Sequence, residues 1–182
     1  CVLLAKTPER KGPLMALVKV DFLSTSLMRT VTINAVVPAD WASIDSLGYA
    51  RSVPRDQQRP FKTLYLLHGV YGNYTDWVTR TRIQSLAEAR NLAVIMPSGE
   101  NGFYNDRVDG ARFGEFIGHE LVEFTRKLFR LSCERKDTFI GGLSMGGYGA
   151  IVNALRHPET FSNVVALSSG LSLNSKRVLE ST

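Results

Sequence analysis

Residues 141–150, Gly-Gly-Leu-Ser-Met-Gly-Gly-Tyr-Gly-Ala, decide the fold, because they contain the pattern Gly-x-Ser-x-Gly centred on Ser144. The pattern lies between a short apolar run at 138–141 and a helical pattern at 145–157. A strand, a sharp turn and a helix in that order are what a nucleophilic serine at a strained turn requires. The turn needs small neighbours, and a glycine stands two residues to either side of the serine. We therefore predict that Ser144 is a nucleophile at the carboxyl end of a buried strand.

Outward from this stretch, short apolar runs alternate with helical patterns. Strands are predicted at 16–23, 29–37, 63–67, 92–96, 138–141 and 164–167. Helices are predicted at about 76–90, 111–131 and 145–157, and polar loops at 39–60 and 98–110. Continuous apolar runs are typical of parallel strands that are buried on both faces. The order therefore predicts an α/β fold, a mostly parallel sheet with helices on both faces, in which the first two strands form an antiparallel hairpin at one edge.

Length and composition exclude several classes of protein. The chain has 182 residues, of which 44% are hydrophobic and 21% charged, and this is typical of a single globular domain. No window approaches the ~18 uninterrupted apolar residues of a membrane span, so we expect no membrane association. The only cysteines are Cys1 and Cys133. This excludes a disulfide-rich miniprotein and favours a reducing, cytoplasmic compartment.

The net charge of +5 does not indicate a nucleic-acid partner. The densest basic cluster lies near the end of one predicted helix and comprises Arg126, Lys127, Arg130, Arg135 and Lys136. Cations complement the carboxyl end of a helix, and no ladder of aromatic residues accompanies the cluster. We interpret it as a solvated helix face and expect no nucleic-acid binding.

The segment Leu-Leu-His-Gly-Val-Tyr-Gly-Asn at 66–73 continues from the buried strand at 63–67 into a loop. In α/β-hydrolases the loop at this place donates one backbone N–H to the oxyanion hole, and the residue after the nucleophile donates the other. We assign these donors to Val70 and Met145. Each such donor is worth roughly 3 kcal/mol to a tetrahedral intermediate. His68 is expected to support the loop by hydrogen bonds rather than to act as a base.

Sites for nucleotides and metals are not predicted. The glycines around Ser144 fit no Gly-x-Gly-x-x-Gly register in a first βα turn, and Gly-Lys-Ser/Thr does not occur. A calcium-binding loop that began at Asn105 would place Arg107 and Phe116 at ligand positions, and Phe116 would stand where a carboxylate is needed. We therefore expect no metal and no cofactor.

Four segments together resemble the putative-esterase family of α/β-hydrolases, which includes S-formylglutathione hydrolases, feruloyl and acetylxylan esterases and mycolyltransferases. They are 66–77 (Leu-Leu-His-Gly-Val-Tyr-Gly-Asn-Tyr-Thr-Asp-Trp), 94–98 (Val-Ile-Met-Pro-Ser), 101–104 (Asn-Gly-Phe-Tyr) and 141–150. Within the family, the sequence is most similar to bacterial tributyrin esterases, over roughly residues 15–170. The resemblance implies an α/β-hydrolase fold, a Ser-Asp-His triad, no cofactor and a small, short-chain acyl ester as substrate. Ser144 matches the nucleophile, and Val70 and Met145 match the oxyanion positions.

The triad is not complete in this sequence. Its chain order is Ser, then Asp or Glu, then His. After Ser144 the only acidic residues are Glu159 and Glu180, and the only histidine, His157, stands beside Pro158 at the end of a helix. His119 lies in the middle of a predicted helix, where a structural role is expected. We expect a serine carboxylesterase whose Asp and His lie beyond residue 182, so that the C-terminal strands are missing from this chain.

Two alternatives stay open. A non-catalytic relative could use the same fold as a binding module, and an acyltransferase could pass the acyl group to an alcohol instead of water. Aromatic residues in the loops expected beside the site, Trp77, Phe103 and Tyr104, could line an acyl pocket or could anchor the loops. Residues 1–14 are expected to be a leader or vector-derived segment, and residues 15–182 the hydrolase domain. The sequence does not indicate an oligomeric state.

Overall fold

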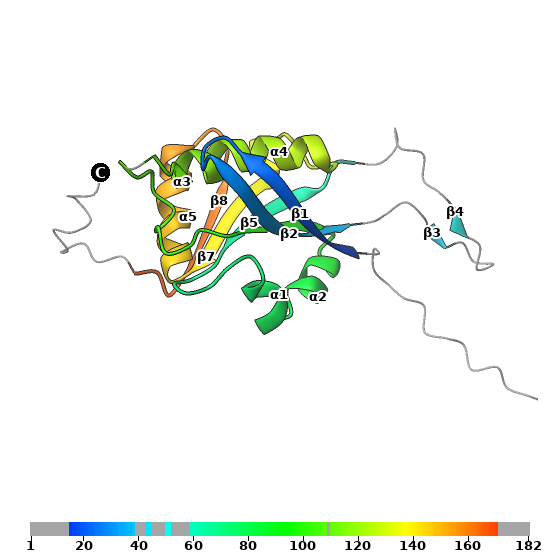
Figure 1. The fold of residues 1–182 in the computed structure, drawn as a ribbon. Helices are drawn as coiled ribbons and strands as arrows, with labels where there is room; N and C mark the ends of the chain where they lie inside the picture. The colour runs from blue at the N-terminus through cyan, green and yellow to red at the C-terminus, as the bar shows by residue number, and fades with distance from the viewer. Residues whose placement is uncertain (1–14, 39–42, 45–49, 52–58, 109, 171–182) are drawn as a thin grey trace, which may run out of the picture.

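The computed structural model describes residues 15–38, 43–44, 50–51, 59–108 and 110–170. Its centre is a six-stranded sheet with the strand order β1-β2-β6-β5-β7-β8 (Figure 1). The strands are β1 (Met15–Ser24), β2 (Arg29–Pro38), β5 (Lys62–Leu67), β6 (Leu92–Pro97), β7 (Thr138–Leu143) and β8 (Asn163–Leu167). Strands β1 and β2 form an antiparallel hairpin at one edge, and β2 is antiparallel to β6. The strands β6, β5, β7 and β8 are mutually parallel, so the predicted architecture is confirmed.

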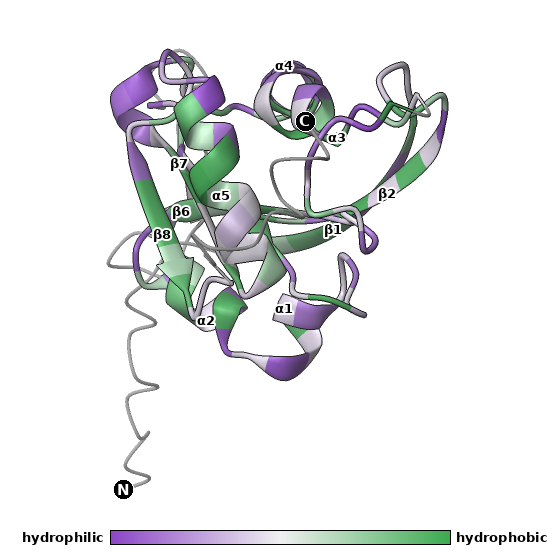
Figure 2. Cartoon of the chain, turned by 90° about the vertical axis from the view of Figure 1, so that its left-hand side faces the viewer, coloured by the Kyte–Doolittle hydropathy of each residue, from purple (hydrophilic) through white to green (hydrophobic). Residues whose placement is uncertain are grey.

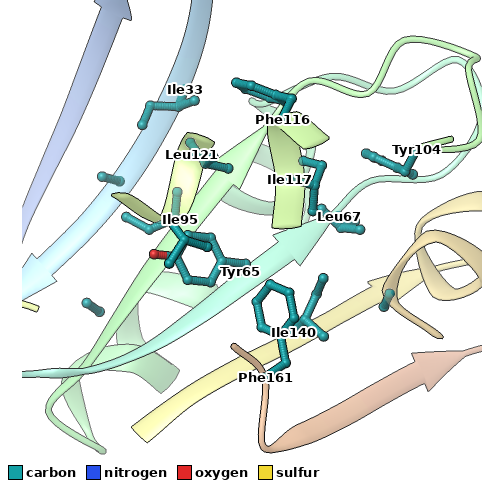
Figure 3. Close-up of a cluster of buried hydrophobic side chains, with 14 of the residues drawn as sticks. Ile33, Tyr65, Leu67, Ile95, Tyr104, Phe116, Ile117, Leu121, Ile140 and Phe161 are labelled. Atoms are coloured by element: carbon teal, nitrogen blue, oxygen red, sulfur yellow. The ribbon is translucent and has the colours of Figure 1, made fainter. Parts of the chain in front are cut away.

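Helices lie on both faces of this sheet (Figure 1). They are α1 (Asp76–Arg80), α2 (Ile83–Glu88), α3 (Phe113–Glu115), the π-helical turn η2 (Phe116–Glu120), α4 (Leu121–Leu128), the 3₁₀ turn η3 (Arg135–Asp137) and α5 (Met145–Arg156). Successive side chains of a strand point to opposite faces, and this alternation sorts the core into two clusters. The larger cluster joins the sheet to α3, η2, α4 and α5, and it includes Ile33, Tyr65, Leu67, Ile95, Leu121 and Ile140 (Figure 3). The smaller cluster lies under α1 and α2 and includes Val36, Leu66, Val94 and Met96.

The single helix predicted at about 76–90 is wrong, because the structure has two short helices there. The backbone of Thr81 between them is extended, with φ −139° and ψ 173°. The Thr81 hydroxyl donates to the Trp77 carbonyl and accepts from the Ile83 N–H at 3.2 Å. A threonine side chain that takes over backbone partners in this way competes with the helix and ends it.

The helix predicted at 111–131 begins and ends slightly inside those bounds and contains one wide turn. The Leu121 N–H bonds to the Phe116 carbonyl, five residues back, which closes the π-helical turn. Gly118 lies within that turn, and a Cβ there would come within 2.1 Å of the His157 ring. The ring therefore packs where only glycine leaves room.

Several predictions fall on residues outside the described part of the chain. These are the leader at 1–14, most of the loop at 39–60 and the tail from residue 171. Within 39–60 the structure describes one short antiparallel pair, β3 (Ser43–Ile44) with β4 (Ala50–Arg51). Among the described helices, none has the length and apolar content to cross a lipid bilayer.

Candidate active site

Ser144 stands at the turn between β7 and α5, where the carboxyl ends of the parallel strands meet. Its backbone has φ 55° and ψ −113°, a conformation that residues with a Cβ rarely adopt. Its N–H donates to the Leu167 carbonyl of β8 at 2.8 Å, which holds the turn against the neighbouring strand. The strand–turn–helix setting predicted for the serine is therefore the one that the structure has, and the turn at residues 142–146 is called the elbow below.

The glycines on either side of Ser144 have no room for a side chain. A Cβ on Gly146 would lie 2.3 Å from the Leu67 carbonyl oxygen, and a Cβ on Gly142 would lie 2.4 Å from the Gly146 carbonyl oxygen. These atoms are backbone, so they cannot rotate away as a flexible side chain could. The two glycines let the end of β5 and the start of α5 approach each other closely at the serine.

The loop after β5 passes directly beside Ser144. A Cβ on Gly69 would lie 3.6 Å from Ser144 Cβ, in ordinary van der Waals contact. The N–H groups of Val70 and Met145 make no hydrogen bond to any described residue. Met145 is the first residue of α5, and the amino end of a helix favours negative charge. The geometry is compatible with the two predicted oxyanion donors, whose role stays a prediction.

His68 is fully occupied by structural hydrogen bonds. Its Nε2 accepts from the Gly99 N–H at 2.8 Å, and its Nδ1 lies 2.6 Å from the Gly69 carbonyl oxygen. Because Nε2 is an acceptor, the proton is on Nδ1 and is donated to Gly69. Burial is the main cause that lowers the pKa of His68, which favours this neutral form. The ring thus ties the loop after β5 to the loop after β6.

The other two of the three histidines in the chain lie elsewhere. His119 is exposed on the helix surface, with Nδ1 3.2 Å from Glu115 and Nε2 3.6 Å from Glu123. His157 follows the last residue of α5, about 20 Å along the helix axis from Ser144 at ~1.5 Å per residue, and packs at Gly118. Among the described residues, the Ser144 hydroxyl has no hydrogen-bond partner. The described part of the chain therefore brings a serine and two candidate donors together but no base.

The three aromatic residues predicted beside the site have different surroundings. Tyr104 is fully buried, and its hydroxyl donates to the His68 carbonyl at 2.9 Å. Trp77 is half-buried, and its indole N–H donates to the Leu67 carbonyl at 3.1 Å. Phe103 is exposed and makes an edge-to-face contact with Tyr148. Tyr104 thus anchors a loop, the alternative role stated for it, and pocket lining by the half-buried Trp77 and the exposed Phe103 stays a prediction.

The sequence analysis did not single out Asn153, which helps to hold one of these loops in place. Asn153 is buried in α5, and its side-chain amide donates to the Tyr104 carbonyl at 3.1 Å and to the Gly149 carbonyl at 2.8 Å. Burial raises the pKa of Tyr104 far above its usual value, so its hydroxyl keeps the proton that it donates. Asn153 lies within a helix and belongs to no recognisable motif, so the sequence carries no signal of this long-range contact.

Within the described ranges, no group of three or more His, Cys, Asp or Glu side chains could hold a metal.

Comparisons with known proteins agree with this geometry. A model of the family described as "Putative esterase" matches residues 24–176. An acetyl esterase of Caldicellulosiruptor saccharolyticus is 45% identical over 158 residues, which are 86% of this chain and 57% of that protein. The chain therefore spans little more than half the length of this relative.

Solved structures show the same fold and the same partial span. FphF of Staphylococcus aureus, a fluorophosphonate-binding serine hydrolase, superposes with a TM-score of 0.75 at 31% identity, over 85% of this chain and 57% of its own. The S-formylglutathione hydrolase FrmB of the same organism superposes with a TM-score of 0.74 at 30% identity, over 93% of this chain and 62% of its own. A ferulic acid esterase at 21% identity shares the fold, with a TM-score of 0.73.

Proposed function

The chain belongs to the putative-esterase family, and from this premise we propose that the full-length protein is a serine carboxylesterase of short-chain acyl esters. The observation that carries the proposal is the position of Ser144. It stands at a strained turn before α5, with Gly69 against it and two neighbouring N–H groups that make no hydrogen bond to a described residue. Such strain costs about 1–3 kcal/mol, and it is kept where a function requires it. A binding module would not need a serine in this conformation.

The proposed reaction has two steps. The Ser144 oxygen attacks the ester carbonyl carbon, and the carbonyl oxygen becomes an oxyanion beside the Val70 and Met145 N–H groups. The carbon–oxygen bond to the alcohol then breaks, the alcohol leaves with the proton taken from the serine, and an acyl-enzyme remains. Water attacks this ester in the same way and releases the carboxylic acid and free serine. Each oxyanion donor would stabilise the transition state by about 3 kcal/mol.

A base must accept the proton of the serine, and we propose that it comes from outside the described residues. His68 has both ring nitrogens engaged, and His119 and His157 have carboxylate neighbours away from the elbow. A histidine oriented by an aspartate or glutamate would complete the triad. The relatives are longer than this chain, which is compatible with such a source.

The first test is the hydrolysis of p-nitrophenyl acetate and butyrate by the full-length protein. Ser144→Ala is expected to lower kcat by several orders of magnitude with little change in Tm, because triad members act as a unit. Ser169→Ala is the matched control, since it deletes the same atom from a half-buried serine whose buried hydroxyl has no described partner. The control should keep wild-type turnover. Near-wild-type turnover of Ser144→Ala would show that the nucleophile is wrongly assigned.

A further inference from the structure

A buried chain of hydrogen bonds connects helix α5 to the loop that carries Val70. The Asn153 amide donates to the Tyr104 carbonyl at 3.1 Å, and the Tyr104 hydroxyl donates to the His68 carbonyl at 2.9 Å. The His68 ring then bonds to the Gly69 carbonyl at 2.6 Å. The side chains of Asn153, Tyr104 and His68 are at most 1% exposed, so water does not compete for these contacts.

The last bond of this chain controls the direction of the Val70 N–H. The Gly69 carbonyl and the Val70 N–H belong to one planar trans peptide unit and point in opposite directions. The carbonyl accepts from the His68 ring and from the Gly72 N–H at 3.2 Å. A carbonyl held by two donors cannot rotate without breaking both bonds. The Val70 N–H is therefore held in the opposite direction, and it makes no hydrogen bond to a described residue.

Tyr104 is itself held tightly in a conformation that does not suit a large side chain. Phe103 and Tyr104 have φ 53° and 59°, two consecutive residues in the region that glycine favours. The Tyr104 ring fills the space left by two glycines. A Cβ on Gly99 would lie 2.0 Å from the ring, and a Cβ on Gly149 would lie 2.4 Å from it. Gly149 belongs to α5, so the ring packs against the same helix that Asn153 belongs to.

Both proposed oxyanion donors thus depend on α5. Met145 is the first residue of the helix, and Asn153 lies eight residues later in it. We propose that Asn153 and Tyr104 are positioning residues that hold the Val70 N–H in register with the Met145 N–H. This inference rests on the proposed esterase function and adds the residues that set the geometry of its oxyanion site. Neither residue touches the substrate.

The test is Tyr104→Phe in the full-length protein, which removes one hydroxyl and keeps the ring between the two glycines. We expect kcat for p-nitrophenyl butyrate to fall about 10- to 100-fold, because a small misplacement of one oxyanion donor weakens transition-state binding. KM should change little, since the ester before reaction does not depend on this donor. Affinity for a trifluoromethyl ketone, which forms an oxyanion on Ser144, should fall by the same factor as kcat/KM.

Tyr65→Phe is the matched control. Tyr65 is also fully buried, and its hydroxyl shares a 2.8 Å hydrogen bond with Thr125 of α4, away from the elbow. This variant should lower Tm about as much as Tyr104→Phe but leave kcat and the affinity for the ketone unchanged. Asn153→Ala should lower kcat as well. Combined with Tyr104→Phe it should lower kcat by less than the product of the two single effects, because both act through one chain of contacts.

The outcomes separate this inference from the function on which it rests. If the wild-type protein hydrolyses esters and Tyr104→Phe keeps its kcat and its affinity for the ketone, the positioning role is overturned and the esterase stands. Equal losses of kcat in Tyr65→Phe and Tyr104→Phe would also overturn it, since general destabilisation would then explain both. A wild-type protein that neither hydrolyses esters nor is labelled at Ser144 by a fluorophosphonate would remove the function and this inference together.

Discussion

At the scale of single residues, the space around Gly146 limits what the elbow can tolerate. A Cβ at this position would meet the carbonyl oxygens of Leu67 and His68 at 2.3 and 2.6 Å. A Cβ added at the adjacent Gly147 would lie 3.1 to 3.3 Å from its three nearest atoms, so these atoms need to move by only a few tenths of an ångström. The two glycines are neighbours in one helix and differ chiefly in this clearance.

We therefore expect Gly146→Ala to lower the free energy of unfolding by at least about 2 kcal/mol, because backbone must shift to admit the methyl group. Gly147→Ala should change it by less than about 1 kcal/mol, since the gain in helix propensity offsets the closer contacts. Urea unfolding followed by circular dichroism measures both. Equal effects of the two substitutions would contradict the close approach of β5 to α5.

At the scale of elements, one carboxylate joins the β1–β2 hairpin to the helical segment that precedes α4. Glu120 accepts from the Ser24 hydroxyl at 2.7 Å, from the Thr25 N–H at 2.6 Å and hydroxyl at 2.9 Å, and from the Ser26 N–H at 3.1 Å. Partial burial by itself would raise the pKa of Glu120. The hydrogen bonds to the ionised form outweigh burial and lower the pKa from 4.5 to about 2.

The lowered pKa predicts how stability depends on pH. Above pH 4.5 the carboxylate is ionised in both states, and its hydrogen bonds contribute fully to stability. As the pH falls from 4.5 towards 2, the unfolded chain binds the proton first, so this contribution is lost. Glu120→Gln should lower stability at pH 7 and flatten its decline in this range. Glu123→Gln, an exposed change on the neighbouring helix α4, is the control that should leave the decline unchanged.

At the scale of the whole molecule, the sheet has an apolar strand at one edge. All five residues of β8 are exposed, and Val165 at 52% exposure is the most exposed of its large apolar side chains. Figure 2 shows the hydrophobic colouring along this strand. β8 bonds to β7 on one side, and no described strand pairs with its other side. An uncovered edge of this kind is a template for association with another chain.

The 182-residue polypeptide should therefore self-associate at micromolar concentration. Val165→Lys should shift it towards monomer, because a charge on the edge strand opposes strand pairing. Val108→Lys is the control, since Val108 is fully exposed in a loop away from the sheet. Size-exclusion chromatography with light scattering measures the mass. Proteins with exposed strand edges associate at concentrations on the order of micromolar to millimolar. A wild-type polypeptide that stays monomeric at about 100 µM would therefore contradict the interpretation of β8 as an uncovered, associating edge. That further strands flank β8 in the full-length protein stays a prediction.

The same polypeptide should react poorly with a fluorophosphonate. Activation of a serine needs a base within hydrogen-bond reach, and no described side chain bonds to the Ser144 hydroxyl. The full-length protein should be labelled at Ser144 within minutes, and its Ser144→Ala variant should not. Intact-mass spectrometry measures the adduct. Strong labelling of Ser144 in the 182-residue polypeptide would mean that His68, His119 or His157 is the base.

Local patterns in the sequence were enough to predict the architecture and the turn that carries Ser144. Each depends on neighbours along the chain: apolar runs of strand length, helical periodicity, and two glycines placed around Ser144. The edge hairpin, the parallel strands and the turn before α5 were all predicted from such patterns and confirmed. The break at Thr81 was missed, because a threonine is compatible with a helix until its side chain takes backbone partners.

The sequence predicted that His68 supports its loop, but the partners in this support were decided only by the tertiary structure. Gly99 is 31 residues from His68, Tyr104 is 36 residues from it, and Asn153 is 49 residues from Tyr104. No local pattern relates residues so far apart. They meet because parallel strands bring their carboxyl ends to one edge of the sheet, so that loops distant in sequence pack together there. Tyr104 is therefore a loop anchor, since in the folded chain two glycines and a carbonyl surround it and no open surface is left for it to line.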